Sequence, residues 1–285
     1  MSKNVQRILA GTALWLVLLI SACQQKPDLK ARTAEFIKAV NNQDVETVEK
    51  LVHPDYIQHN PFVPTGRDGF VKLFPILKKY NTRAETVRMF QDGNYVVLHN
   101  IWKNAEPFGA PIMVAFDVIR FDEDGLIAEH WDVMMINTPP NPAGRSLTDG
   151  PTEILEGHPT DEYKAKVASL FDSLISGNPE EAGKAFQESF QKDYHQHNPN
   201  AGDGIQGFMS AQKNGDLVFE FKKQHKVLGQ GNFVLSISEG THRGKPAVFY
   251  DLLRFENGTI AEHWDVIQDI PSENLANDNT MFGFQ

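Results

Sequence analysis

The stretch "IAEHWDV" decides the fold of this chain, because it occurs at Ile127–Val133 and again, without a substitution, at Ile260–Val266. Other strings repeat in the same order along the chain. These are "DYIQHNP" at 55–61 with "DYHQHNP" at 193–199, and "FDVIRF" at 116–121 with "YDLLRF" at 250–255. Internal repeats on this scale indicate duplicated structural units. The sequence therefore predicts two copies of one domain.

The chain length agrees with this duplication, since 285 residues allow two domains of about 130 residues each. In each copy, apolar residues first recur at helical spacing and later in strand-like runs with turn residues between them. Asp44 is an expected N-cap, and Pro75 is expected to kink or divide a helix. Three helices followed by about four long antiparallel strands predict an α+β domain whose helices cover one face of a curved sheet.

The predicted boundaries follow the repeats and the composition. They are a signal peptide at 1–22, a tether at 23–28, a first domain at 29–138, a linker at 139–160 and a second domain at 161–285. The linker is rich in Pro, Gly, Asn, Asp and Thr, as surface connections are. It is also long enough to wrap over a domain, where Arg145 or Asp149 could act as part of a lid.

The first 22 residues have the layout of a secretory signal, with Lys3 and Arg7 before an apolar run and small residues at its end. The string "ISAC" resembles a lipobox, which implies that Cys23, the single cysteine, becomes a lipidated first residue. Gln24 at the next position resembles lipoproteins of the outer membrane that face the periplasm. We therefore expect a lipid-anchored envelope protein; a plain signal peptide that happens to carry a cysteine is the alternative.

The charge of the chain is acidic. Its formal net charge is −10, and loss of the predicted signal removes two cations and no acid. A protein this acidic, without a long cluster of Lys and Arg, is a poor ligand for nucleic acid. We expect no nucleic-acid partner.

Several of these strings together resemble the SnoaL-like polyketide cyclase family of the nuclear transport factor 2-like superfamily. They are the helix-rich start, "DYIQHNP", the closing "DGLIAEHWDV", and the segments "NPAGRSLTDGPTEI" and "NTMF". The last two also resemble bacterial SnoaL-like proteins described as aldol-condensation enzymes. The resemblance implies two tandem cone-shaped α+β roll domains, each a curved mixed or antiparallel sheet wrapped on three helices around a pocket. It also implies proton transfer without a cofactor.

Side chains alternate across a strand, so His130 and Asp132 share one face of the closing strand and Glu129 and Trp131 share the other. We favour the first pair as pocket residues, because an imidazole next to a carboxylate can move protons near neutral pH. The family resemblance also implies a catalytic Asp on this strand. In the alternative, Glu129 and Trp131 face the interior.

The resemblance further implies that His59 points into the pocket of the first copy, although it could instead bond to nearby main chain. His99, which the second copy lacks, is predicted to join it there. The second copy offers His197, His263 and Asp265 in corresponding places, so the first copy has the richer predicted site. Asp117 and Asp251 also recur, but could pair with Arg120 and Arg254.

These residues predict a cofactor-independent acid–base pocket for a small apolar carbonyl compound, in which Asp132 takes a proton, His130 orients it, and His59 or His99 binds the enolate oxygen. The reaction would be an aldol condensation, a cyclisation or an isomerisation. We expect no cofactor and no metal, since the histidines lack a short ligand spacing. The competing hypothesis is a non-catalytic lipoprotein that binds a hydrophobic ligand or another protein. In either case the two domains are expected to form an intramolecular pseudo-dimer.

Overall fold

The computed structural model describes residues 27–284. The predicted signal peptide and Cys23 lie outside these residues. Within the described part of the chain, no helix is both long enough and apolar enough to cross a membrane.

The first domain begins with short helices and continues as a sheet. Its elements are α1 (Leu29–Asn42), α2 (Val45–Leu51), β1 (Val52–Gln58), α3 (Arg67–Val71), α4 (Phe74–Tyr80), β2 (Arg83–Asp92), β3 (Tyr95–Lys103), η1 (Glu106–Phe108), β4 (Ile112–Phe121) and β5 (Ile127–Ile136). Asp44 caps α2 as predicted, because its side chain accepts a hydrogen bond from the Thr47 N–H. Pro75 stands in the first turn of α4 and separates it from α3, so the division predicted at this proline is confirmed.

The second domain repeats this order with longer helices. Its elements are α5 (Thr160–Ile175), α6 (Pro179–Ser189), β6 (Phe190–Gln196), α7 (Gly204–Asn214), β7 (Phe219–Gln230), β8 (Phe233–His242), β9 (Lys245–Glu256) and β10 (Thr259–Asp269). Here the α3–α4 pair of the first domain is replaced by the single helix α7, which has no proline to interrupt it.

Each domain contains one mixed five-stranded sheet, in the order β1-β5-β4-β3-β2 and β6-β10-β9-β8-β7. The prediction of three helices followed by about four strands in each domain does not include β1 and β6. Instead, α2 ends at Leu51 and β1 pairs in parallel with β5, with Gln58 opposite His130. This pairing brings the two repeated motifs of each domain side by side.

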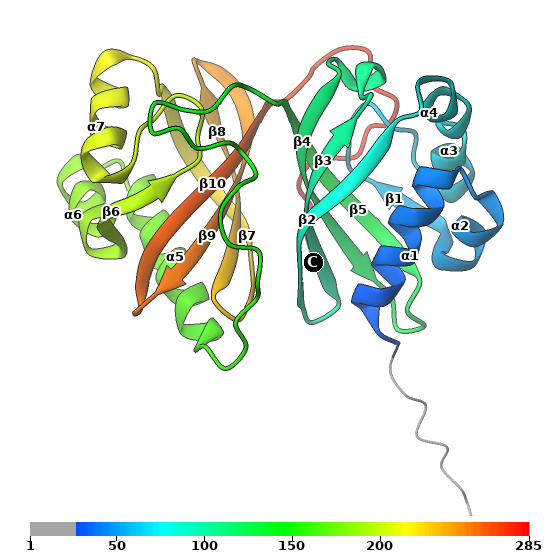
Figure 1. Cartoon of the computed structure of the whole chain (residues 1–285), viewed down its shortest axis with the longest axis horizontal. Helices are drawn as coiled ribbons and strands as arrows, with labels where there is room; N and C mark the ends of the chain where they lie inside the picture. Colours follow the sequence, from blue (N-terminus) through cyan, green and yellow to red (C-terminus); the bar gives the residue numbers. More distant parts are fainter. Residues whose placement is uncertain (1–26, 285) are drawn as a thin grey trace, which may run out of the picture.

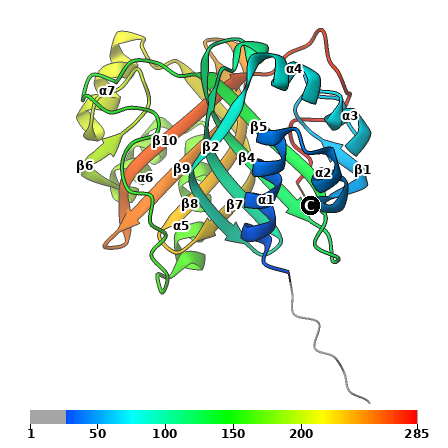
Figure 2. The same cartoon turned by 45° about the vertical axis from the view of Figure 1, so that its right-hand side comes forward.

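The two sheets pack face to face and the helices lie on the outer sides, as Figure 1 shows. β10 contacts β4 and β5 of the first sheet, and Figure 2 shows it in a view turned by 45°. One hydrophobic cluster joins the domains, and it includes Trp131 and Phe116 from the first sheet and Trp264, Tyr250 and Phe233 from the second. The predicted α+β architecture of two tandem domains is confirmed.

The linker covers the second domain, and the C-terminal segment covers the first. The linker crosses the second domain (Figure 1). There the buried Asn141 amide donates to the Gln196 carbonyl, and Arg145 makes a bidentate ion pair with Asp203. The C-terminal segment runs along the first domain, where the Asn277 amide donates to the carbonyl of Asn60. Each segment follows the last strand of one domain and fastens to the other, so the chain holds the pair together at two related places.

Candidate functional site

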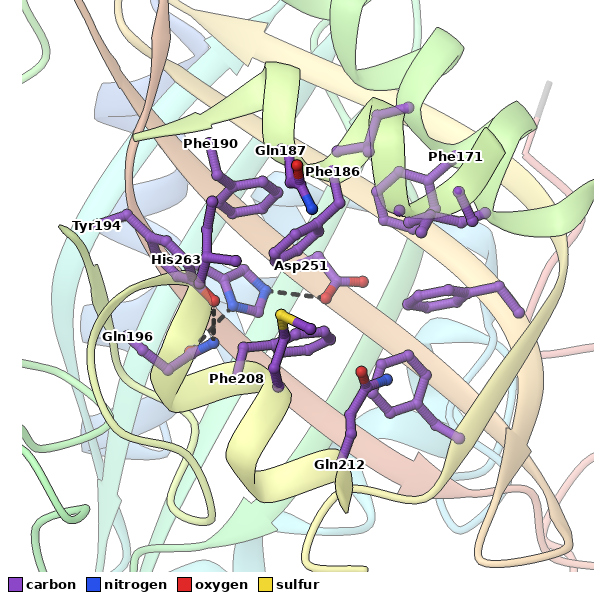
Figure 3. Close-up of a pocket in the computed structure, with 18 of the residues that line it drawn as sticks. Phe171, Phe186, Gln187, Phe190, Tyr194, Gln196, Phe208, Gln212, Asp251 and His263 are labelled. Atoms are coloured by element: carbon purple, nitrogen blue, oxygen red, sulfur yellow. Dashed lines mark hydrogen bonds and ion pairs between the residues drawn. The ribbon is translucent and has the colours of Figure 1, made fainter. Parts of the chain in front are cut away.

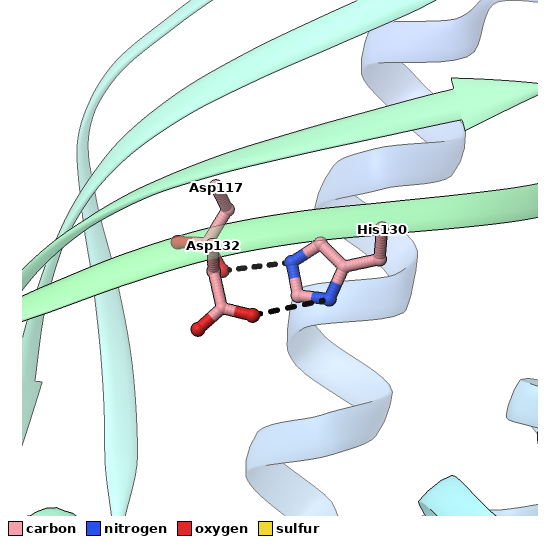
Figure 4. Close-up of side chains that lie close together, drawn as sticks. All are labelled: Asp117, His130 and Asp132. Carbon is pink, nitrogen blue, oxygen red and sulfur yellow. Dashed lines mark hydrogen bonds and ion pairs between the residues drawn. The ribbon is translucent and has the colours of Figure 1, made fainter. Parts of the chain in front are cut away.

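Three side chains of the first domain meet on the helix-facing side of its sheet. Asp117 on β4 lies directly opposite Asp132 on β5 in the strand register. Figure 4 shows His130 beside both carboxylates. Its Nε2 is 3.0 Å from Asp117 Oδ1, and its Nδ1 is 3.8 Å from Asp132 Oδ1. The structure therefore brings His130 and Asp132 together and adds Asp117, which bonds to His130 rather than to Arg120.

Amides and a hydroxyl from β1, from the segment just after it and from β3 hold this group in place. The Asn60 amide donates to Asp132 Oδ2 at 2.6 Å, and the Asn100 amide donates to Asp117 Oδ2 at 2.7 Å. Tyr56 and Gln58 both contact His130 Nδ1, at 3.1 and 3.2 Å. Tyr56, Gln58 and Asn60 all recur in the repeated string "DYIQHNP", which is the sequence signal for them, although the prediction did not place them beside His130 and Asp132. Asn100 has no such signal, because Ser238 replaces it in the second copy.

Burial and neighbouring charges shift both titrating groups. Burial raises the pKa of Asp132 to about 6, and the opposing carboxylate of Asp117 acts in the same direction. For His130, burial alone would lower the pKa, but the hydrogen bond to Asp117 and the charge of Asp132 outweigh it and raise the pKa. A buried carboxyl with a pKa near neutrality is suited to act as a general base.

The triad of Asp117, His130 and Asp132 has a counterpart in the second domain, the triad of Asp251, His263 and Asp265. His263 Nε2 is 3.0 Å from Asp251 Oδ1, and its Nδ1 is 3.0 Å from Gln196 Oε1. Burial alone would lower the pKa of His263, but the hydrogen bond to Asp251 and the charge of Asp265 outweigh it and raise the pKa. The Asn198 amide donates to Asp265 Oδ2 at 2.7 Å. Burial raises the pKa of Asp265 as well.

His59 and His99 do not join His130, so the prediction of four groups in one pocket is wrong. His59 stacks on Trp131 and its Nδ1 is 2.7 Å from the Thr280 carbonyl. His99 stacks on Phe116. Because side chains alternate along β3, His99 lies on the face between the two domains, and its neighbour Asn100 takes the place next to Asp117.

His197 of the second copy is likewise on the face between the domains and not with His263. It is fully buried, stacks on Trp264, and its Nε2 is 2.9 Å from Glu262 Oε1. Its Nδ1 lies 2.8 Å from Asp149 Oδ1 in the linker. The Glu-Trp face of each closing strand therefore forms the domain interface, and the His-Asp face points towards the helices.

A cavity of about 350 Å³ lies between the helices and the sheet of the second domain and reaches the triad. Figure 3 shows His263 and Asp251 at its inner end, among Phe186, Phe190 and Phe208. The rest of the lining is mostly apolar, with Tyr194, Gln187, Gln196 and Gln212 as polar groups. The volume falls in the range of small-molecule sites. Asp265 borders a separate space of about 30 Å³ next to the triad.

In the first domain, aromatic side chains pack closely over the corresponding triad. Tyr56, which contacts His130, packs edge-on against Phe70, and Phe70 packs against Phe74. Phe74 belongs to this buried core, whereas the residue at the same place in the repeat, Gln212, borders the cavity. The sequence favoured the first copy for its extra histidines, but the cavity beside a triad lies in the second.

A larger cavity of about 930 Å³ lies between the two domains, away from both triads. It is bordered by Phe108 of η1, by Met134 and Ile136 of β5, and by Arg243 and Lys245 of the second domain. Of the residues that support the first triad, it touches Asn60.

Each triad has the donor atoms that a metal ion could use. One atom of each of the three residues lies within 4.8 Å of the others, both in Asp117, His130 and Asp132 and in Asp251, His263 and Asp265. However, both ring nitrogens of each histidine already have hydrogen-bond partners.

One family model matches part of the chain. Residues 33–130 match the family model described as a SnoaL-like domain, as the sequence motifs predicted. No curated protein matches the chain.

Three crystal structures illustrate the structural matches, each with a TM-score of 0.33. IdmH from Streptomyces antibioticus is 22% identical over 38% of this chain and 92% of its own. An NTF2-like protein from Cytophaga hutchinsonii is 17% identical over 39% of this chain and 94% of its own. A cystatin-fold protein from Novosphingobium aromaticivorans is 21% identical over 37% of this chain and 97% of its own.

Proposed function

On the premise that residues 33–130 form a SnoaL-like domain, we propose that the chain acts on a small, largely apolar carbonyl compound by acid–base chemistry that needs no cofactor. We place the reaction in the second domain. The observation that carries this proposal is the cavity of about 350 Å³ that ends on Asp251 and His263. Its apolar wall suits the body of such a compound, and the triad supplies groups that exchange protons.

In the proposed reaction, Asp265 takes a proton from the carbon next to the carbonyl, and the C–H electron pair forms the C=C bond of an enolate. Its raised pKa makes it a stronger base than an ordinary carboxylate. Asp251 holds the His263 ring, whose positive charge stabilises the negative charge that develops. The enolate can then attack a second carbonyl, as in an aldol condensation or cyclisation, or take back the proton at another carbon, as in an isomerisation.

Tyr194 is the candidate donor to the enolate oxygen. It borders the cavity, and its hydroxyl accepts a hydrogen bond from Gln196 Nε2 at 3.2 Å, which leaves its own hydrogen for a ligand. Burial raises the pKa of Tyr194, so the phenol stays protonated at neutral pH. Under this proposal Tyr194 takes the role that the sequence prediction gave to His59 or His99.

A second candidate function is binding without turnover. One observation favours it: Asp251 and His263 border the cavity of about 350 Å³, whereas Asp265 borders the space of about 30 Å³ beside it. A ligand in the cavity of about 350 Å³ would then contact the His263 imidazole without presenting a C–H group to Asp265. In this case the domain pair would be a carrier or receptor for a hydrophobic molecule.

The test of catalysis is hydrogen exchange in D₂O on 4-phenylbutan-2-one, followed by the loss of its α-proton signals in NMR spectra. We expect the wild type to accelerate exchange and Asp265→Asn to slow it at least about a hundredfold, since a general base contributes on that order. Asp132→Asn, the equivalent substitution in the first domain, is the comparison between the copies. A loss in that variant instead of Asp265→Asn would place the reaction in the first domain, and a bound ketone without exchange would favour the carrier.

We also propose that the protein is held at the cell envelope by a lipid on Cys23. The support is the signal-like start of the sequence and the position of the first helix, α1, whose N-cap Asp28 stands five residues after the cysteine. Such a short tether would hold the domains near the membrane surface. Cys23→Ser should move the protein from the membrane pellet to the soluble fraction of lysed cells. An unchanged distribution would contradict lipidation at this residue.

A further inference from the structure

Two carboxylate oxygens of the second triad lack hydrogen-bond partners among the described residues. They are Asp251 Oδ2 and Asp265 Oδ1. Both residues are only 6% exposed. Burying an acceptor on a charged group without a donor is costly, so native proteins usually supply one. Two such oxygens beside a cavity point to a donor that the described chain does not provide.

The first domain shows what kind of donor fits there. In that copy the Asn100 amide donates to Asp117 Oδ2, which corresponds to Asp251 Oδ2. Ser238 stands at the same place in the repeat, and its hydroxyl lies 3.5 Å from Ser236 Oγ. The exchange of Asn for Ser therefore removes an N–H group from the second triad. An N–H group of a ligand would replace it.

The space for such a group is next to the two oxygens. The small space of about 30 Å³ is bordered by Asp251, His263 and Asp265, which is enough room for one group of the size of water or ammonium. It adjoins the cavity of about 350 Å³, with which it shares Asp251, His263 and several aromatic residues. Figure 3 shows one oxygen of Asp251 turned to His263 and the other turned away from the ring.

We infer that the second domain binds an apolar molecule that carries a protonated amine, with the ammonium group between Asp251 and Asp265 and the apolar body between Phe171, Phe186 and Phe208. The charge of the site favours a cation, because two carboxylates face one imidazole. This inference rests on the proposed function in taking the cavity as the ligand site, and it narrows the substrate class to amino carbonyl compounds.

The test compares three probes with the same skeleton, namely 3-phenylpropylamine, 3-phenylpropan-1-ol and 3-phenylpropionate, by titration calorimetry on the mature chain. We expect the amine to bind at least about tenfold more tightly than the alcohol, since hydrogen bonds to charged groups exceed neutral ones by about that factor. The carboxylate should bind most weakly. If the alcohol binds as tightly as the amine, or the carboxylate more tightly than both, the inference is wrong, and a bound water is the better occupant of the small space.

A variant that copies the first domain sharpens the test. Ser238→Asn restores the missing amide donor, so we expect the preference for the amine over the alcohol to fall by about tenfold. Thr241→Asn, the same kind of change three residues along β8 and outside the cavity lining, should keep the preference. An unchanged preference in a folded Ser238→Asn variant would overturn the inference. If that variant does not fold, the probe series on the wild type decides alone.

The two proposals can fail separately. A preference for the amine without hydrogen exchange on the ketone would keep the ligand class and contradict catalysis. Exchange that depends on Asp265, without a preference for the amine, would keep the proposed reaction and contradict the ligand class.

Discussion

Glu262→Gln should lower the free energy of unfolding by about 3–5 kcal/mol, the usual cost of removing one partner from a buried ion pair. Glu262 is fully buried between the domains. Its Oε2 accepts from Arg254 Nε at 2.7 Å and its Oε1 lies 2.9 Å from His197 Nε2. The variant keeps the shape of the side chain but leaves the buried Arg254 guanidinium with the exposed Glu256 as its remaining carboxylate partner. Urea unfolding followed by tryptophan fluorescence measures the loss.

The first copy supplies the matched control for this prediction. Glu129 bonds to Arg120 and His59 in the corresponding place, but the Arg120 side chain is 18% exposed against 8% for Arg254. Because water can solvate Arg120 in part, Glu129→Gln should cost less than Glu262→Gln. Equal losses in the two variants, or a loss under about 1 kcal/mol for Glu262→Gln, would contradict the importance of burial here.

The effect of Glu262 should also depend on pH. Burial alone would raise the pKa of Glu262, but hydrogen bonds from His197 and Arg254 outweigh it and lower the pKa below 4.5. The folded state therefore holds the ionised form more strongly than the unfolded chain does. The stabilisation is complete above the unfolded pKa and is lost as the pH falls through the folded pKa. The difference between wild type and Glu262→Gln should shrink below about pH 4.

The duplicated strand shows how far sequence reasoning reaches in this protein. Repeats and turn signals are sufficient to predict two α+β domains and the division of the α3–α4 region at Pro75. The alternation of side chains also predicts that His130 and Trp131 of the closing strand face opposite sides. These features depend on local pattern, which a single sequence contains.

The composition of the site depends on pairing between distant strands, and there the prediction fails. Because the predicted strands do not include β1, the local pattern does not place Asn60 beside Asp132. The position of His59 in the pocket is implied by the family resemblance, and the structure places it on Trp131 instead. The sequence does not give the register of β3 against β4, so it does not show which face of β3 carries His99. The structure places His99 opposite Phe116. The better signal is the exchange of Phe74, a core residue of the first copy, for Gln212, which borders the cavity of the second.

Asp132→Asn should raise the thermal stability of the protein at pH 8, although it removes a residue of a repeated motif. The pKa of Asp132 is raised by burial from 3.8 to about 6, so the folded state holds its proton more strongly than the unfolded chain does. The sign follows from linkage: stability falls as the pH rises from about 4 to about 6, and the whole cost applies above that range. A difference of about 2 pKa units corresponds to about 2–3 kcal/mol, which an uncharged Asn avoids.

The size of this gain in stability depends on how much of the interaction of His130 with carboxylates is lost in Asp132→Asn. Its closer contact is with Asp117, at 3.0 Å against 3.8 Å for Asp132, so the imidazole keeps its main partner in Asp132→Asn. Asp117→Asn is the opposing control, because its single amide oxygen can accept from only one of His130 and Asn100, and its loss of charge removes the ion pair with His130, so it should destabilise the protein. Calorimetric melting at pH 4.5 and pH 8 should show a gain for Asp132→Asn that appears mainly at pH 8. A lower melting temperature than the wild type at pH 8 would contradict the argument. A gain would mean that the chain keeps a carboxylate at this place that costs stability.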